Sequence, residues 1–372
     1  MLPKILQLGK FYPPNVGGIE RVMQDICDGM NARGLICDVL CSSSSYNFSY
    51  EMLESRARIY RTKSFGKFAS TSITPQMIFT LQKLIKAYDI IHLHLPDPMA
   101  NLALLFANSR NKIIIIHWHS DIIKQKYLLN LYAPLQSWLL TRADKIIGTS
   151  PKYIAESAFL QPYHDKCISI PIGIESAAPF SKSNREPKKL FALGRLVPYK
   201  GFEYAIEAMQ YLPDHHLYIG GEGILYSKLQ AQIKRLHLEH QVTLLGFLDA
   251  KEIIKHYKSS SVFLFPSITK NEAFGIAQIE AMSYGLPVIS CSIKGSGVDW
   301  VNQNNTTGIV VPPRNPQAIA NAIATIEKDY QGFSTRAQQR FASCFSKEVM
   351  LDSIQALYLQ AYDLLIGGGG QH

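Results

Sequence analysis

The sequence predicts an α/β protein of two doubly wound domains, each with a parallel sheet covered by helices. Short apolar runs alternate with amphipathic helical segments along most of the chain, an order typical of repeated βαβ units. A stretch without periodicity, ESAAPFSKSNREPKK at 175–189, interrupts this alternation, and the same order then restarts. Its Ser, Pro and charged residues indicate a linker. The 372 residues are enough for two hydrophobic cores.

The first domain is expected over residues 1–178. Its buried strands are predicted in KILQL, ICDVLC, DIIHLHL, KIIIIHWH and DKIIGTS. A helix is predicted after the first strand, because apolar side chains recur in IERVMQDICDGM with the helical period. These side chains are Ile19, Val22, Met23, Ile26, Cys27 and Met30.

The second domain is expected over residues 179–346. Strands are predicted in LFALG, HLYIG, VTLLG, VFLFP and PVIS, and helices at 201–211, 224–236, 250–257 and 275–284. Residues 347–366 form a further amphipathic pattern, which we expect to be a helix that packs back on the first domain. The closing residues 367–372, GGGGQH, are expected to be a flexible tail.

Composition narrows the class of protein. No apolar run reaches the length of a membrane span, and MLPKILQLG is predicted to be a strand and not a signal peptide, so we expect a cytoplasmic protein. The net charge of +9 suggests an anionic partner, although a solvated basic surface is the alternative. The charge is spread along the chain and not gathered in stripes with aromatic residues, so we expect no nucleic-acid partner.

Glycine turns stand between strands and helices in both domains. In YPPNVGGIER, Gly17 and Gly18 directly precede a predicted helix, and IGGEG at 219–223 repeats the arrangement. Residues without a Cβ allow backbone N–H groups to approach an anion at the positive end of a helix. An ordinary turn is the alternative reading of both motifs.

Two cations follow a strand of the second domain in LGRLVPYKG. Arg195 and Lys200 lie in one loop between the end of the strand and the next helix. Two cations at the carboxyl end of a strand suit a diphosphate. Two solvated loop charges are the alternative.

Two glutamates flank a predicted helix start in TKNEAFGIAQIEAMSYGLPVIS. Glu272 precedes the helix and Glu280 lies about one and a half turns inside it, at a separation of about 10 Å by helical rise. The amides of Phe274, Gly275 and Ile276 would face an anion between them. The segment therefore predicts a cradle for a nucleotide sugar, in which one glutamate binds the sugar, the other the ribose, and the helix start the phosphate.

Histidines end two neighbouring strands of the first domain. If IHWHSD is extended, His117, His119 and Asp121 share one face. A metal would need further ligands, for which the sequence offers no obvious candidate, so a hydrogen bond to a substrate hydroxyl is the alternative. His92 and His94 in HLHLPDP are expected to be structural or to line a cleft.

The motifs GGIERV, HSD, GRLVPYKGFEYAIEAM, NEAFGIAQIEAMSYGLPVIS and TGIVVPP, in this order, resemble the GT4 family of retaining glycosyltransferases. They span residues 9 to about 325. The resemblance implies the GT-B fold, with two Rossmann-like domains facing across a cleft, the first for the acceptor and the second for the nucleotide sugar. It also implies that Arg195 and Lys200 bind the donor diphosphate and that Glu272 binds hydroxyls of the transferred sugar.

The same resemblance implies that Glu280 binds the ribose and that His119 lies beside the reacting sugar. Gly17 and Gly18 would lie near the phosphate or acceptor, with Gly17 and Asp121 assigned to the acceptor side and Gly18 to the donor. No Asp-x-Asp motif is present, and we expect neither a metal nor another cofactor. The leaving diphosphate would instead be stabilised by the two cations and by helix amides.

GKFYPP and SGVDWV resemble segments of bacterial polysaccharide and O-antigen transferases. A UDP-hexose or UDP-N-acetylhexosamine is the favoured donor, and a GDP-mannose-dependent mannosyltransferase is the alternative. A non-catalytic sugar-nucleotide-binding or nucleic-acid-binding protein is the alternative of another class.

The expected acceptor is a saccharide on a lipid diphosphate. It would be reached peripherally, at the inner face of the cytoplasmic membrane, through the basic and aromatic segments 56–68 and 124–140. A core-facing helix with a solvated loop is the alternative for these segments.

Overall fold

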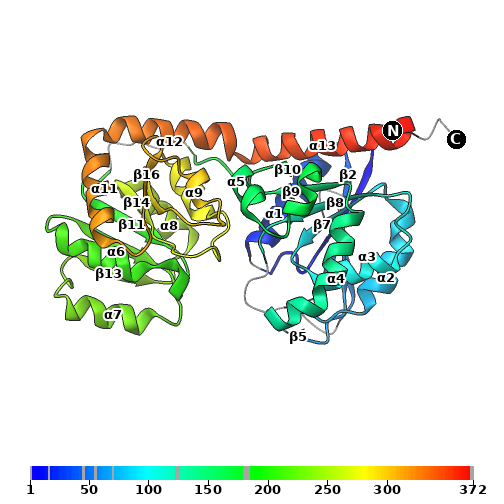
Figure 1. Ribbon diagram of the computed structural model, residues 1–372, viewed down its shortest axis with the longest axis horizontal. Helices are drawn as coiled ribbons and strands as arrows, with labels where there is room; N and C mark the ends of the chain where they lie inside the picture. The colour runs from blue at the N-terminus through cyan, green and yellow to red at the C-terminus, as the bar shows by residue number, and fades with distance from the viewer. Residues whose placement is uncertain are drawn as a thin grey trace. The chain divides into compact units, whose positions relative to one another are not determined.

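The computed structural model describes residues 2–15, 17–43, 47–53, 57–68, 71–121, 126–178 and 185–368. The chain forms two compact units (Figure 1), Met1–Gly173 with Lys347–His372, and Ile174–Ser346. The division after Gly173 lies slightly earlier than the expected boundary after residue 178. The reason is local: Ile174 forms a parallel bridge with Ser346, and its amide donates to the carbonyl oxygen of Phe345 at 2.9 Å.

The first unit contains an eight-stranded sheet in the order β10-β9-β8-β7-β1-β2-β4-β3. All neighbouring strands are parallel except the β3–β4 pair. The strands are β1 Lys4–Gly9, β2 Ile36–Ser42, β3 Ser49–Met52, β4 Arg58–Thr62, β7 Ile90–Leu95, β8 Ile113–Trp118, β9 Lys145–Gly148 and β10 Cys167–Ser169. A separate hairpin joins β5 Lys67–Phe68 and β6 Thr71–Ser72. The five strands predicted from apolar runs are therefore confirmed, whereas β3, β4 and β10, which are less buried, were not predicted.

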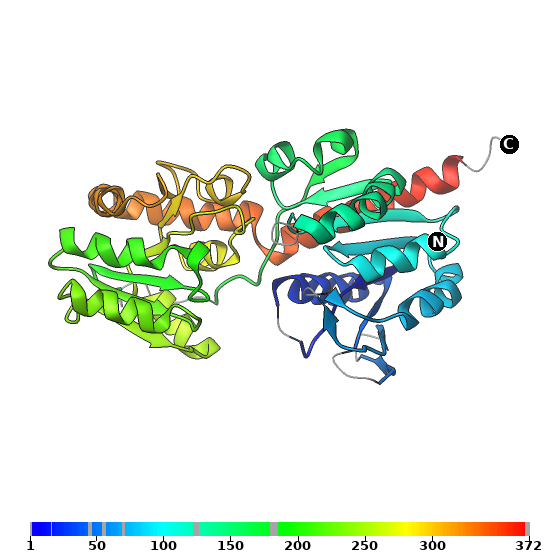
Figure 2. The ribbon, with the colours of Figure 1, turned by 60° about the horizontal axis from the view of Figure 1, so that its bottom comes forward.

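The helices of this unit are α1 Gly18–Ala32, α2 Gln76–Leu84, α3 Pro98–Phe106, α4 Lys126–Arg142, α5 Pro151–Glu156 and α13 Lys347–Gly368, with 3-10 turns η1 Ile85–Ala87 and η2 Gln161–Lys166. The final helix α13 contacts α1 and β8 (Figures 1 and 2). Arg33, the residue directly after α1, pairs with Glu348 and Asp352, each at 2.8 Å. The predicted return of the C-terminal helix is thus confirmed, but the helix includes Gly367 and Gly368, which were expected in the tail.

The second unit contains a six-stranded parallel sheet in the order β13-β12-β11-β14-β15-β16. Its strands are β11 Lys189–Leu193, β12 His216–Gly220, β13 Val242–Gly246, β14 Val262–Phe265, β15 Val288–Cys291 and β16 Gly308–Val311. Its helices are α6 Phe202–Ala208, α7 Tyr226–Arg235, α8 Ala250–Ser259, α9 Ile276–Ser283, α10 Val298–Val301, α11 Pro316–Lys328 and α12 Tyr330–Cys344, with 3-10 turns η4 Pro198–Lys200 and η5 Met209–Tyr211. The predicted strands and the four predicted helices are present, with ends shifted by a few residues.

In each sheet the chain adds strands first on one side of a central strand and then on the other. Each sheet therefore has a switch point, where two neighbouring strands continue in opposite directions across the sheet. In the first unit this happens between β1 and β7, and in the second between β11 and β14. Ligands of open α/β sheets bind at the carboxyl ends of strands at such a point. In the second unit the two loops that leave β11 and β14 are joined by a 2.8 Å hydrogen bond from the amide of Ile268 to the carbonyl oxygen of Tyr199.

Within the described ranges, no helix combines the length and the apolar character that a membrane span requires.

Candidate functional site

The side chains of Lys200 and Glu272 meet where β11 and β14 end. Nζ of Lys200 lies 2.5 Å from Oε2 of Glu272, and the two side chains are only 12% and 13% exposed. Oγ of Ser267 donates to the same carboxylate oxygen at 3.2 Å. Partial burial reduces screening by salt, so this ion pair is stronger than one on an open surface. The sequence assigned these residues to different parts of one ligand, and the structure brings them into contact.

Lys200 is also held by aromatic rings. Its Nζ lies 4.9 Å from the ring centroid of Phe265 and 5.6 Å from that of Tyr199. Arg195, in the same loop, donates from Nη2 to the hydroxyl of Tyr199 at 3.3 Å. Within the described residues that is the one hydrogen bond of the Arg195 side chain, so most of its five N–H donors are available to an anion.

Helix α9 begins directly after Gly275, which has φ of +87° in the left-handed region. A Cβ at this position would lie 2.7 Å from the ring of Phe265. Both the backbone conformation and the close packing therefore require glycine here. The first amides of a helix have no acceptor within the helix, and those of Phe274, Gly275 and Ile276 stand at the start of α9, as the sequence predicted.

Glu280 occupies a different environment from Glu272. Its carboxylate is largely buried in α9, and the hydroxyl of Tyr257 in α8 donates to Oε2 at 2.9 Å. Burial raises the pKa of the Glu280 carboxyl, while the Tyr257 hydrogen bond acts in the opposite direction. No sequence signal identified Tyr257 as a partner, because it belongs to another helix and to no motif.

The glycines of IGGEG have a packing role. A Cβ on Gly221, which has φ of +127°, would lie 2.0 Å from the carbonyl oxygen of Gly194, and a Cβ on Gly223 would lie 2.4 Å from that of Leu196. The amide of Leu196 also donates to the carbonyl oxygen of Glu222 at 2.8 Å. The loop after β12 therefore lies directly against the loop that carries Arg195, which accounts for its glycines without an anion.

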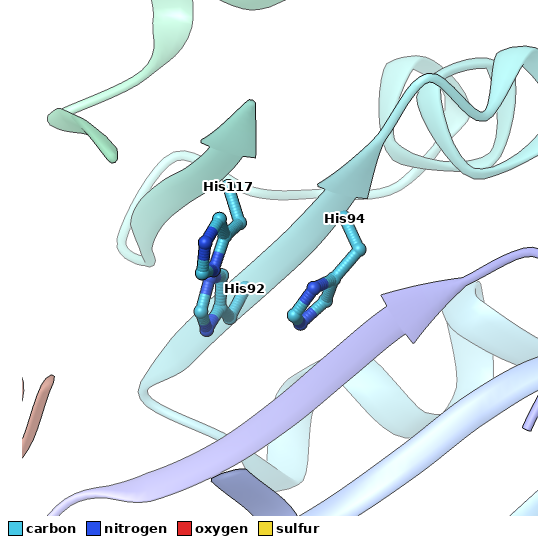
Figure 3. A group of neighbouring side chains, drawn as sticks. All are labelled: His92, His94 and His117. Carbon is cyan, nitrogen blue, oxygen red and sulfur yellow. The ribbon is translucent and has the colours of Figure 1, made fainter. Parts of the chain in front are cut away.

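Four histidines gather in the first unit, at the carboxyl end of its central strands. His92 and His94 project from β7 and His117 from β8, on the same face of the sheet (Figure 3). His119 follows β8, and its ring stacks on that of His117 with centroids 4.2 Å apart. All four are buried, and burial lowers the pKa of each ring below 6.5, that of His117 to about 3. The four rings are therefore neutral at pH 7.

These rings have distinct hydrogen-bond partners. Nε2 of His94 lies 2.8 Å from Oε1 of Gln7, and its Nδ1 lies 3.0 Å from Nε2 of His119. Nδ1 of His92 lies 2.6 Å from the hydroxyl of Tyr358 in α13. Both nitrogens of His117 are buried without a partner in the described part of the chain. The order of strands places Gln7 here and the packing of α13 places Tyr358 here, so the sequence did not predict their contacts.

His92, His94 and His117 could be considered as metal ligands, because one nitrogen of each lies within 4.8 Å of the others. The sequence offered no obvious further metal ligand beside His117. In the structure the neighbouring strand β7 supplies two candidates, His92 and His94. However, both nitrogens of His94 are already engaged with Gln7 and His119. Coordination by all three residues would require those hydrogen bonds to break.

Asp121 does not share a face with His117 and His119, so this expectation was wrong. Its Oδ1 accepts hydrogen bonds from Nε1 of Trp118 at 3.0 Å and from the hydroxyls of Tyr153 and Ser157, each at 2.8 Å. Trp118 points to the opposite face from its neighbours because side chains alternate along a strand. In this structure Asp121 fixes the turn after β8, and its assignment to the acceptor side stays a prediction.

Gly17 and Gly18 stand where the sequence predicted, between β1 and α1. Gly18 is the first residue of α1, and Gly17 precedes it in an extended conformation. The start of α1 therefore follows the carboxyl end of β1, the strand next to β7 in the sheet. The glycine pair and the histidine cluster thus occupy the same edge of the first sheet.

Each of the two units is a doubly wound α/β domain with polar groups at its own switch point. The second unit has an ion pair and a helix start there, and the first unit has histidines. The family descriptions "Glycosyltransferase Family 4" and "Glycosyl transferases group 1" match residues 16–177 and 174–342. The chain is 30% identical to "O-antigen chain mannosyltransferase C" of Escherichia coli over 94% of this chain and 95% of the relative. It is 32% identical to "D-rhamnosyltransferase WbpZ" of Pseudomonas aeruginosa, covering 86% and 85%.

The chain belongs to glycosyltransferase family 4, as the motifs predicted. Among solved structures, sucrose-phosphate synthase from Thermosynechococcus elongatus superposes with a TM-score of 0.75 at 20% identity, over 97% of this chain and 99% of that one. Anabaena Alr3699/HepE in complex with UDP superposes with a TM-score of 0.77 at 19% identity, over 96% and 100%. The expected GT-B fold is confirmed.

Proposed function

We propose that this glycosyltransferase moves a hexose, with retention of configuration, from a nucleotide sugar to a hydroxyl of a lipid-diphosphate-linked saccharide in the synthesis of O-antigen or a related polysaccharide. The observation that carries the proposal is the largely buried Lys200–Glu272 pair where β11 and β14 end. It places a cation and a carboxylate side by side, as a ligand with a diphosphate next to a sugar requires.

The proposed reaction breaks the bond between the anomeric carbon and the diphosphate oxygen. Negative charge then develops on the departing diphosphate, where Lys200, Arg195 and the first amides of α9 stabilise it. The acceptor hydroxyl attacks from the same side of the sugar and transfers its proton to an oxygen of the leaving phosphate. No step requires a metal or another cofactor.

Glu272 suits a positioning role better than that of a nucleophile. Its carboxylate already accepts hydrogen bonds from Lys200 and Ser267, which lowers its nucleophilicity but leaves lone pairs for sugar hydroxyls. Retaining glycosidases use a second carboxylate as the nucleophile. Here the acceptor hydroxyl attacks from the side of the leaving group, which keeps the configuration in one displacement, so a carboxylate nucleophile is unnecessary.

The base and the sugar of the donor are separate questions. The sequence favoured a UDP-sugar over GDP-mannose. The two relatives named above are a mannosyltransferase and a D-rhamnosyltransferase, and D-rhamnose is 6-deoxy-D-mannose. We therefore propose a sugar of manno configuration, which supports the GDP-linked alternative, while the complex of Alr3699/HepE with UDP is too distant in sequence to decide the base.

A donor panel tests this proposal. Release of nucleotide from UDP-glucose, UDP-N-acetylglucosamine, GDP-mannose and GDP-D-rhamnose would be measured with a diphosphate-linked saccharide acceptor, and the anomeric configuration of the product read by NMR. We expect turnover with one manno-configured donor and a product that keeps the donor's configuration. Inversion would contradict the mechanism, and absence of transfer from all four donors would contradict the proposed activity.

Contact with a membrane is proposed through the first unit, but on a different surface from the one the sequence indicated. Arg58 and Arg61 of segment 56–68 pair with Asp38 and Glu51 at 2.8 and 2.6 Å. In segment 124–140, residues 124 and 125 and the side chains up to residue 131 lie outside the described residues, and Leu139 is buried. Two cations of segment 56–68 are therefore engaged within the protein, while Lys124 and Lys126 of segment 124–140 lie outside the residues whose side chains are described.

Helices α2 and α3, side by side in Figure 1, offer a better surface. Phe79 of α2 is 63% exposed and Phe106 of α3 is 57% exposed. Lys83 of α2 and Arg110, four residues after the end of α3, are exposed as well. Nε2 of Gln82 donates to the carbonyl oxygen of Phe106 at 2.9 Å, which ties the helices together. Aromatic and basic residues together suit an anionic lipid surface.

Sedimentation with vesicles of phosphatidylglycerol and phosphatidylethanolamine tests this contact. We expect binding at low salt that weakens at high salt, and a loss of about tenfold in the double variant Phe79→Ser, Phe106→Ser. Tyr211→Ser in the second unit, where the side chain is 52% exposed, is the matched control and should bind as the unaltered protein does. Equal binding by the double variant would contradict a role for the α2–α3 surface.

A further inference from the structure

The hydrogen bonds of Gln7, His94 and His119 form a chain that ends at the carboxyl edge of the first sheet. Gln7 lies in β1, His94 in the adjacent β7, and His119 directly after β8. Each link is short: 2.8 Å between Oε1 of Gln7 and Nε2 of His94, and 3.0 Å between Nδ1 of His94 and Nε2 of His119. Gln7 and His94 are fully buried or nearly so.

The orientation of the Gln7 amide decides the direction of the chain. Its Nε2 lies 3.2 Å from the carbonyl oxygen of Met23 and 3.4 Å from Sγ of Cys37. A carbonyl oxygen can only accept a hydrogen bond, so the NH2 group must face Met23 and the amide oxygen must face His94. With the amide flipped, Oε1 of Gln7 would face the carbonyl oxygen of Met23, and the buried NH2 group would face Nε2 of His94.

The direction of every proton in the chain then follows. Oε1 of Gln7 can only accept, so Nε2 of His94 carries the hydrogen. In a neutral ring Nδ1 of His94 is then an acceptor, and Nε2 of His119 must donate to it. Burial and the neighbouring imidazoles hold the pKa of both rings well below 6.5, so both are neutral at pH 7. Nδ1 of His119 is consequently left with a lone pair and no hydrogen.

That remaining nitrogen is available. Within the described residues, Nδ1 of His119 has no hydrogen-bond partner, and unlike the nitrogens of His117 it is not a fully buried unpaired atom. We infer that Gln7 and His94 are positioning residues which fix His119 in its Nε2–H tautomer, so that His119 presents a hydrogen-bond acceptor to a hydroxyl of the reacting sugar or the acceptor. This inference rests on the proposed function only for the identity of that hydroxyl.

The acceptor character has a consequence for selection of the ligand. A ring locked as an acceptor binds an O–H group and disfavours another acceptor, such as a phosphate oxygen, at the same place. A ring free to change tautomer would accommodate either. Positioning by Gln7 would therefore hold a sugar hydroxyl at His119 and direct the diphosphate elsewhere.

The tautomer can be read directly in the free, full-length protein. With 15N-histidine labelling, long-range proton–nitrogen spectra distinguish a protonated from an unprotonated ring nitrogen, and the signals of His119 are assigned by their loss in His119→Gln. We expect Nδ1 of His119 to be unprotonated in the unaltered protein. A hydrogen on Nδ1 would overturn the inference, whatever the activity is.

Two substitutions at Gln7 separate positioning from packing. Burial favours a protonated side chain in Gln7→Glu, which can donate its O–H to the carbonyl oxygen of Met23 and keep an acceptor oxygen for His94, so this variant should keep the Nε2–H tautomer. Gln7→Leu removes the acceptor and should give a mixture. We expect kcat/KM of Gln7→Leu to fall about tenfold, the size of one lost neutral hydrogen bond, and Gln7→Glu to retain more activity than Gln7→Leu. An unchanged tautomer in a folded Gln7→Leu protein would contradict the inference.

Tyr358→Phe is the matched control, because it removes a hydrogen bond from His92 in the same cluster but not from the chain to His119. In Tyr358→Phe the tautomer of His119 should be unchanged. A changed tautomer would show that any lost hydrogen bond in the cluster alters His119, and this would overturn the specific role of Gln7. If the proposed glycosyl transfer itself fails, the unaltered protein will show no activity while the tautomer remains as expected. The two failures can thus be distinguished.

Discussion

The polar site residues of the two units differ in charge and in burial. In the second unit, Lys200 and Glu272 are charged, close together and partly open to solvent. In the first unit, four imidazoles are buried and held neutral, because burial and their neighbours disfavour the charged form. Charged side chains therefore stand at the proposed diphosphate site of the second unit, whereas the histidines of the first unit offer neutral hydrogen-bonding groups.

The largest expected effect comes from removing charge in the second unit. Lys200→Ala should lower turnover about a hundredfold or more, because a donor that stabilises charge in the transition state is lost and Glu272 loses its partner. Arg195→Ala should act in the same direction. Steady-state rates with the preferred donor check this, and unchanged rates for both variants would refute the assignment of the diphosphate site.

A chelator tests whether a metal ion, and not Lys200 and Arg195, supplies the positive charge at the proposed diphosphate site. Activity should persist in excess EDTA, because Lys200, Arg195 and helix amides take the place of a cation. Complete loss that is restored by one divalent metal would contradict the proposed mechanism.

The neutral histidines of the first unit predict a dependence of stability on pH. Their folded pKa values lie below 6.5, so below that pH the unfolded chain binds protons that the folded chain does not. The contribution of these four rings to stability should therefore be constant above about pH 7 and fall as the pH drops below 6.5, by up to about 1.4 kcal/mol per pH unit for each ring. Urea unfolding at pH 7.5 and 5.5 measures the fall.

His117→Phe should reduce that slope, because it removes a buried ring whose pKa is lowered to about 3 and whose nitrogens have no partner in the described residues. The exposed His164 gives the control, and His164→Asn should keep the full slope. Equal slopes in His117→Phe and the unaltered protein would show that this histidine is not held neutral by the fold.

The smallest effect is expected between the two glutamates. Glu280→Ala should weaken binding of the free nucleotide by about tenfold, the value of a hydrogen bond to a charged group. Glu272→Ala should leave nucleotide affinity nearly intact, while it slows transfer and reduces the discrimination among donor sugars. Competition by UDP and GDP measures both variants, and indistinguishable affinities would remove the division of labour between Glu272 and Glu280.

Local patterns were sufficient for many elements and for the main motifs. Apolar runs and the helical period depend on neighbouring residues only, so strands such as β7 and β8 and helices such as α1 and α9 could be predicted. Gly275 could be predicted at the start of α9, because a strand-to-helix turn of this kind favours glycine. The family could be identified because its motifs keep their order along the chain.

Contacts between residues far apart in sequence were decided by the tertiary structure. Sheet order places Gln7 beside His94, and the return of α13 places Tyr358 against His92. Strand alternation suggested that Asp121 continues the face of His119, but β8 ends at Trp118 and Asp121 bonds to Tyr153 instead. The sequence determined which side chains were present and which elements carry them. Packing decided which of them meet, because the partners that satisfy a buried polar group are chosen by the whole fold.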